Sequence, residues 1–365
     1  MDPRTRPRVL AVEPVLPTHR HDQDEIAAAL APLLTDPGPR RDLLHRLHTA
    51  TGVRTRHLAL PLGRYAELTA RPDAFDAASA VFAQVGLDLA ERAVKGALAG
   101  AGLAPEDVDV LLFTTVTGVA APSLDAQLLE RVGLRRDVVR WPGFGLGCVA
   151  GAAGLSRLED HLAGHPGQVG LLVSVELCSL TLQPSDTSVA NLVASGLFGD
   201  GATAVVVAGA GRAGDRPGWA VLEHTSRLLP DSADALGFQV GSRGLRIVLS
   251  AGLPQILHRH VGADVRAFLA GCAPGGVEGV GGVEGVDRWV VHPGGPKVLD
   301  ALAQTLDLPA AALATSRQVM TEVGNLSSSA VLHVLARTPA VPGERTVLLG
   351  VGPGVSTETV LLEAV

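Results

Sequence analysis

Two stretches of the sequence share a pattern that decides the fold. The first reads Gly147-Cys-Val-Ala-Gly-Ala-Ala-Gly-Leu155, and the second reads Gly324-Asn-Leu-Ser-Ser-Ser-Ala-Val-Leu332. In each, a glycine and a polar residue open an apolar helix. Each is preceded by a continuous apolar run typical of a buried parallel strand, at 108–115 and at 286–293. Each is followed by a segment expected to form a glycine-turn hairpin, at 197–207 and at 347–362.

The same order of elements therefore occurs twice. This repetition predicts a duplicated, layered α/β fold with pseudo-twofold symmetry. We expect an N-terminal half at 1–215 and a C-terminal half at 216–365, joined near 208–218, where Gly, Arg and Pro are frequent. A second break is expected at 271–286, where Gly-Gly-Val-Glu-Gly-Val occurs in tandem. That segment is either an ordinary surface insertion or a lid.

Composition excludes several classes of protein. The 365 residues include 47% hydrophobic residues, enough for a large buried core, and the net charge of −7 argues against nucleic acid as a partner. No apolar stretch is long enough for a membrane span or a secretory signal. The three cysteines are scattered and form neither a disulfide framework nor a Cys-x-x-Cys metal site. We expect a cytoplasmic enzyme.

Three residues could carry chemistry. Cys148 is expected at a helix start, where the helix dipole would favour a nucleophilic thiolate; alternatively it is a small buried residue. His292 ends an apolar strand before Pro-Gly-Gly-Pro and is either a base or a structural histidine. Asn325 is either a donor to an oxyanion or a helix N-cap. Because the pseudo-twofold would bring Cys148 and Asn325 to one cleft, the set indicates acyl transfer with enolate stabilisation.

Other patterns in the sequence do not indicate a nucleotide-binding or metal-binding site. The sequence Gly145-x-Gly147-x-x-Ala150 imitates a dinucleotide-binding turn, but a cysteine stands inside it, and no phosphate-binding loop of the Gly-Lys-Ser type occurs. The histidine pairs His19/His21 and His45/His48 lack other ligands at metal-binding spacing. We expect no metal and no resident cofactor.

Six motifs resemble those of the type III polyketide synthases, the chalcone-synthase superfamily of the thiolase fold, in its bacterial branch. They are Gly147-Cys-Val-Ala-Gly151, Pro184-Ser-Asp-Thr187, Gly196-Leu-Phe-Gly-Asp-Gly201, His292-Pro-Gly-Gly-Pro296, Gly324-Asn-Leu-Ser-Ser328 and Gly350-Val-Gly-Pro-Gly354. The fourth and sixth distinguish this family from acyl-CoA-primed ketoacyl synthases, which share the Cys-His-Asn triad.

The resemblance implies an acyltransferase that uses coenzyme A (CoA) thioesters, malonyl-CoA and an acyl-CoA starter, as substrates, and that forms a homodimer. It implies that Cys148 carries the chain, with His292 and the helix start keeping the sulfur as thiolate. His292 and Asn325 would drive malonyl-CoA decarboxylation. Phe198 would be the gatekeeper between the CoA tunnel and the cavity. Arg46 and Lys297 would contact CoA phosphates, although each could equally be a solvated surface charge.

The cavity positions implied by the resemblance hold small or medium residues: Ile247, Cys178, Thr181, Val116, Thr117 and Ala121. With 3% aromatic residues in the chain, an open aliphatic cavity is expected, which favours a fatty acyl starter extended iteratively and cyclised to a pyrone or resorcinol. One alternative is a malonyl-primed bacterial synthase that makes a polyhydroxylated aromatic. Another is an acyltransferase that performs a single condensation, and a third is an inactive scaffold subunit.

Overall fold

The computed structural model describes residues 2–241, 243–272 and 281–365, and the segment 273–280, which holds the first of the two tandem glycine-rich copies, lies outside them. Nine strands form a continuous sheet in the order β11-β12-β13-β8-β1-β7-β6-β4-β5. Its N-terminal part consists of β1 (Arg8–Val15), β4 (Val110–Thr115), β5 (Val139–Phe144), β6 (Val169–Leu177) and β7 (Asp200–Ala208). Its C-terminal part consists of β8 (Trp219–Leu228), β11 (Arg288–Val291), β12 (Arg345–Gly352) and β13 (Ser356–Ala364).

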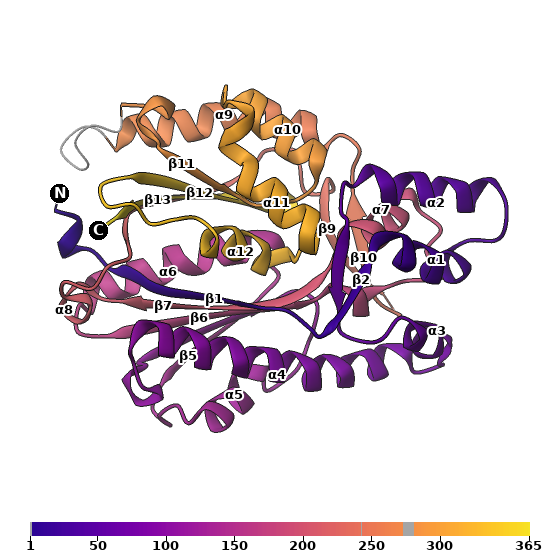
Figure 1. Ribbon diagram of the computed structural model, residues 1–365, viewed down its shortest axis with the longest axis horizontal. Helices are drawn as coiled ribbons and strands as arrows, with labels where there is room; N and C mark the ends of the chain where they lie inside the picture. Colours follow the sequence, from indigo (N-terminus) through magenta and orange to yellow (C-terminus); the bar gives the residue numbers. More distant parts are fainter. Residues whose placement is uncertain (1, 242, 273–280) are drawn as a thin grey trace.

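The two parts of the sheet are joined through only two residue pairs of β1 and β8, Arg8 with Ala220 and Val9 with Trp219. They lie over one another with helices between and outside them (Figure 1). Helices α6 (Ala150–Gly164) and α12 (Ala330–Ala336) fill the middle layer, while α9 (Leu253–Gly271) and α10 (Pro296–Thr305) cover one outer face. Helices α4 (Ala74–Ala101) and α5 (Leu124–Val132) cover the other. This five-layered arrangement confirms the expected fold class.

Strand pairing shows the duplication directly. In the N-terminal half, β4 runs parallel to β6, β6 is antiparallel to β7, and β7 is antiparallel to β1. In the C-terminal half, β11, β12, β13 and β8 repeat the same senses in the same order. One detail of the expected repeat is wrong: 347–362 is a true hairpin, whereas 197–207 is the end of a helix followed by the single strand β7. Strand β7 pairs instead with β6 and β1, which both come earlier in the chain.

A smaller unit sits at one end of the layers. It contains α1 (Gln23–Leu34), α2 (Pro39–Ala50), α3 (Gly63–Ala70) and α7 (Val189–Leu197), with the strand pairs β2 (His19–Asp22)/β3 (Thr55–Leu58) and β9 (Leu236–Gly241)/β10 (Gly244–Leu249). It has its own apolar cluster, built around Ile26, Leu44 and Leu192. The remaining helices are α8 (Ala210–Ala213), in the expected join between the halves, and α11 (Ala314–Val323). None of the helices in the described part of the chain combines the length and hydropathy that a membrane-spanning segment requires.

Candidate active site

Cys148 lies in a 3-10 turn, Gly147–Val149, that leads directly into α6. The turn needs glycine at its first position, because Gly147 has a φ of 54° and a Cβ there would come within 2.6 Å of Pro353. The cysteine is buried, and its sulfur donates to the Ser327 hydroxyl across 3.6 Å. The nucleophile candidate of the N-terminal half is therefore in contact with the serine turn of the C-terminal half.

Asn325 is held by its backbone rather than by its side-chain amide. Its N–H donates to the Leu197 carbonyl over 2.9 Å, its carbonyl accepts from Gly199 over 3.0 Å, and it forms an isolated bridge with Phe198. Its Oδ1 accepts from the Ser327 backbone N–H at 2.8 Å. Its Nδ2 makes no hydrogen bond within the described residues, so both amide donors remain for a bound group.

His292 follows β11 at the carboxyl end of a parallel strand, as expected. Its backbone N–H donates to Leu349 of β12 over 2.9 Å, and its ring is buried. The next residue of β12, Gly350, packs against the Cys148 turn so closely that a Cβ would lie 3.2 Å from the Val149 side chain. The three candidate residues thus lie on adjoining elements, although two come from one half of the chain and one from the other.

Burial acts against the charged forms of the site residues. It raises the pKa of the Cys148 thiol to about 12, because desolvation outweighs the hydrogen bond to Ser327, which lowers this pKa, and the Glu176 carboxylate adds a smaller rise. Burial also lowers the pKa of His292 to about 3. Burial therefore favours a neutral thiol and a neutral imidazole, which acts against the thiolate expected from the helix start. A helix dipole is worth about 1 kcal/mol or less at exposed sites, which desolvation of a buried sulfur exceeds.

Glu176 is a site residue that the motifs did not reveal. It is the one charged residue of the fully buried strand β6. It accepts hydrogen bonds from Thr117 at 2.8 Å, from the Val116 N–H at 3.1 Å and from the Ser328 hydroxyl. Burial raises its pKa. An acidic residue inside an apolar strand was the available signal, because such a group persists only with dedicated partners.

Four of the expected gatekeeper and cavity residues share one pocket of about 600 Å³, counted with its open mouth. They are Phe198, Ile247, Cys178 and Thr181. Burial, followed by the Glu176 and Asp200 carboxylates and then by Cys148, raises the pKa of Cys178. Cys148, His292 and Asn325 are not among the residues that line this pocket, but Phe198 in its wall forms a backbone bridge with Asn325, so the pocket adjoins the Asn325 turn.

The other expected residues are placed differently. Thr117 lines a neighbouring pocket, and Val116 is buried at the Glu176 carboxylate. Ala121 is exposed on the single chain, where it lines neither of these two pockets, and its place in the cavity stays a prediction. Arg46 on α2 and Lys297 in the first turn of α10 are both exposed.

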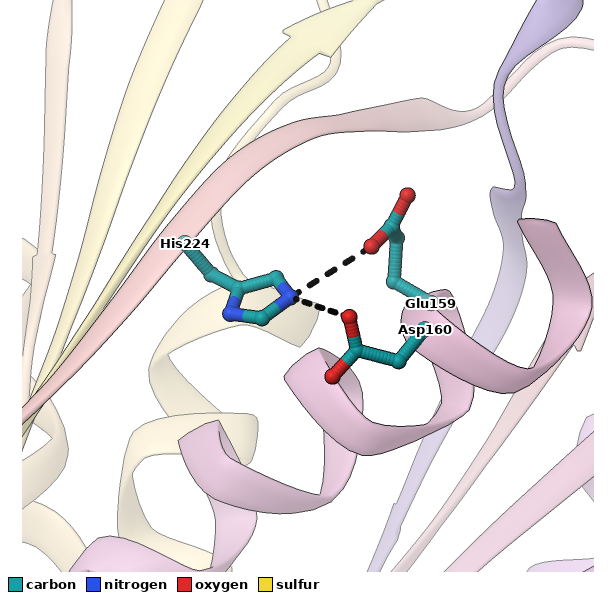
Figure 2. Close-up of side chains that lie close together, drawn as sticks. All are labelled: Glu159, Asp160 and His224. Atoms are coloured by element: carbon teal, nitrogen blue, oxygen red, sulfur yellow. Dashed lines mark hydrogen bonds and ion pairs between the residues drawn. The ribbon is translucent and has the colours of Figure 1, made fainter. Parts of the chain in front are cut away.

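One cluster in the described residues has ligand types that could hold a metal: Glu159 and Asp160 of α6 and His224 of β8 (Figure 2). The imidazole Nε2 lies 3.4 Å from Glu159 and 3.2 Å from Asp160. The Glu159 hydrogen bond, followed by the nearby carboxylate charges, raises the pKa of His224. Arg6 also lies 3.5 Å from Glu159. The carboxylates already have cationic partners, so we interpret the cluster as an ion-paired clamp between the two halves.

Comparison with known proteins identifies the family. Residues 4–211 match the N-terminal domain of chalcone and stilbene synthases, and residues 221–365 match the C-terminal domain. The chain therefore belongs to this family, the type III polyketide synthases, which are acyltransferases that use malonyl-CoA and acyl-CoA substrates.

Two relatives and one solved structure are similar to this chain along most of its length. The chain is 50% identical to a 1,3,6,8-tetrahydroxynaphthalene synthase of Streptomyces peucetius subsp. caesius, over 97% of this chain and 92% of the relative. It is 34% identical to the synthase of the same name from Streptomyces griseus, over 88% and 83%. The crystal structure of 1,3,6,8-tetrahydroxynaphthalene synthase from Streptomyces coelicolor A3(2) superimposes with a TM-score of 0.87 at 31% identity, covering 97% of this chain and 98% of that chain.

Proposed function

We propose that this synthase takes malonyl-CoA as both starter and extender and makes a polyhydroxylated aromatic of the tetrahydroxynaphthalene kind. The observation that carries the proposal is 50% identity along nearly the whole length of a 1,3,6,8-tetrahydroxynaphthalene synthase. It favours the alternative weighed from the sequence over the fatty acyl starter. Malonyl-CoA can supply every carbon of a naphthalene skeleton as two-carbon units, so no separate starter is required.

In the proposed loading step, the Cys148 sulfur attacks the thioester carbonyl of malonyl-CoA and its proton passes to His292. The neutral resting pair suits this transfer, because the imidazole is free to accept the proton when the sulfur attacks. The CoA thiolate leaves and takes up the proton. The chain is then bound to Cys148 as a thioester.

In the proposed extension step, a second malonyl-CoA loses carbon dioxide, and the electron pair of the broken bond passes into an enolate. The unpaired Asn325 amide and an imidazole N–H of His292 donate to the enolate oxygen. One such donor is commonly worth ~3–4 kcal/mol. The enolate carbon attacks the carbonyl of the Cys148 thioester and expels the sulfur, which leaves the lengthened chain as a CoA thioester. The Cys148 sulfur then attacks that thioester, CoA leaves, and the chain is bound to Cys148 again.

Two further expectations belong to this proposal. The chain acts on CoA thioesters without a resident cofactor or metal, and the exposed cations Arg46 and Lys297 are candidates for contact with CoA phosphates. The enzyme forms a homodimer. Exposed apolar side chains on and near the edge strand β5 support a subunit interface at this edge of the sheet. They are Val119, Val139 and Phe144, each about half exposed.

Product analysis tests the proposal. Purified enzyme given malonyl-CoA alone should release a tetrahydroxynaphthalene, identified by liquid chromatography and mass spectrometry, whereas the Cys148→Ala variant should release none. Alkylpyrones formed only when a fatty acyl-CoA is added would refute malonyl priming. Products carrying a single added unit would refute iterative extension.

A further inference from the structure

A guanidinium group lies in the wall of the pocket that holds the gatekeeper. Arg56, in β3, is 2% exposed and lines this pocket together with Phe198 and Cys178. Its Nε donates to Gln23 over 3.1 Å, and its Nη1 donates to the Phe198 carbonyl over 2.7 Å. Its Nη2 is buried and has no hydrogen-bond partner among the described residues. One of the two terminal nitrogens of the Arg56 guanidinium therefore has no hydrogen-bond partner among the described residues.

The charge of Arg56 is also incompletely neutralised. The carboxylate that acts on it most is Asp200, whose oxygens are taken up by the Ala59 N–H at 2.6 Å, the Ser179 N–H at 2.8 Å and the Ser179 hydroxyl. No described carboxylate is within ion-pair distance of Arg56. A buried cation of this kind is costly unless an anion or further acceptors reach it.

The rest of the pocket offers no other anion. Its walls are mainly apolar, with Ile26, Leu30 and Ile247 among them, and the neutral polar groups near Arg56 are Tyr65 and Ser179, which bond to each other at 2.6 Å. A hydrocarbon tail in this pocket would leave Nη2 unsatisfied. A carboxylate would satisfy it, because the guanidinium fork matches that group in shape and charge.

We propose that Arg56 determines starter specificity by binding the free carboxylate at the far end of the growing chain. This inference rests on the proposed malonyl priming. A chain started from malonyl-CoA carries a carboxylate at the end remote from Cys148, and each extension moves that end further from the sulfur and into the pocket. A chain started from a neutral acyl-CoA presents an alkyl end to the same guanidinium. Arg56 thereby selects a dicarboxylic starter over a neutral one.

Isotope labelling measures this selection independently of total activity. The enzyme receives malonyl-CoA with an excess of ¹³C-labelled acetyl-CoA, and mass spectrometry gives the fraction of product that contains the label. The label is necessary because acetyl- and malonyl-primed chains have the same formula after the terminal β-keto acid loses carbon dioxide. The wild-type product should remain largely unlabelled.

The variants separate recognition from structural support. Arg56→Gln should raise the labelled fraction about tenfold, as expected for the loss of one hydrogen bond to a charged group. Arg56→Lys, which keeps the charge but loses the fork, should give an intermediate fraction. His48→Gln is the matched control: His48 is a buried neutral group of the same unit, bonded to Ser195 at 3.0 Å, and its loss should leave the labelled fraction unchanged.

Each result decides a separate point. A wild-type product rich in label would refute malonyl priming itself. An unlabelled wild-type product together with an unchanged labelled fraction in Arg56→Gln would refute the role of Arg56 and leave priming intact. If Arg56→Gln is insoluble or makes no product, the same competition is run on Arg56→Lys, and the acyl groups on Cys148 are weighed by intact-protein mass spectrometry. A wild-type ratio of malonyl to acetyl adducts in that variant would overturn the inference.

Discussion

Cys148 and Asn325 occupy equivalent places in the two halves, and their backbones are built alike. Each follows a glycine with positive φ, 54° at Gly147 and 75° at Gly324, and each is followed by a helix of the middle layer. Their environments differ. The cysteine turn packs against Pro353 and the hairpin of the C-terminal half, whereas the asparagine backbone is bonded to the gatekeeper segment around Phe198. The fold thus gives two matching backbone turns with different side chains, and the proposed function assigns chain attachment to one and oxyanion stabilisation to the other.

The largest expected effect comes from exchanging each of these two side chains for alanine. Cys148→Ala should abolish acyl loading completely, because no other group at the site carries the chain. Asn325→Ala should still load but should decarboxylate malonyl-CoA about a hundredfold to a thousandfold more slowly, the usual result of removing one oxyanion donor. Intact-protein mass spectrometry measures loading, and carbon dioxide release measures decarboxylation. Equal loss of both activities in Asn325→Ala would contradict the division of roles.

An intermediate effect is expected where the two turns meet. A Cβ on Gly151 of α6 would lie 2.2 Å from the backbone carbonyl of Ser328, so Gly151→Ala should destabilise the fold by about 2–3 kcal/mol. Gly164→Ala, in the last turn of the same helix with no atom within 4 Å of its Cβ, should be neutral or stabilise by less than ~1 kcal/mol. Chemical denaturation of both variants measures the difference. Similar stabilities would mean that the halves are not tightly packed at this point.

The smallest effect is expected at the partly buried clamp between the halves. The pKa of His224 is raised by Glu159 and its neighbouring carboxylates, so folding favours the charged imidazole. Its contribution should be complete below pH about 6.5, the ordinary imidazole pKa, and should fade as pH rises through the raised value. His224→Gln should therefore cost more stability at pH 5.5 than at pH 8.5. Because the Asp160 carboxylate is largely exposed and the imidazole is partly exposed, water screens the pair and the cost should stay below ~1 kcal/mol. A larger loss at the alkaline pH would contradict the ion pairing.

Much of the active site could be inferred from the sequence, because its signals are local. The glycine before Cys148, the one before Asn325 and the Pro-Gly-Gly-Pro after His292 each shape a turn through nearby residues. The residues that were missed depend on distant partners. Glu176 is satisfied by Thr117 and Ser328, and Arg56 reaches Phe198 across 142 residues of chain. No spacing rule connects such pairs.

The sequence by itself determined the duplicated α/β fold and the candidate Cys-His-Asn set, since hydrophobic periodicity and turn residues act over a few positions. The resemblance of its six motifs indicated the family. Only the tertiary structure decided that burial raises the pKa of the Cys148 thiol, that Ala121 is exposed on the single chain and that Arg56 lies in the pocket wall. The reason is physical. A pKa, an exposure or an unpaired donor depends on how much water and which groups surround an atom, and those surroundings come from segments remote in the chain.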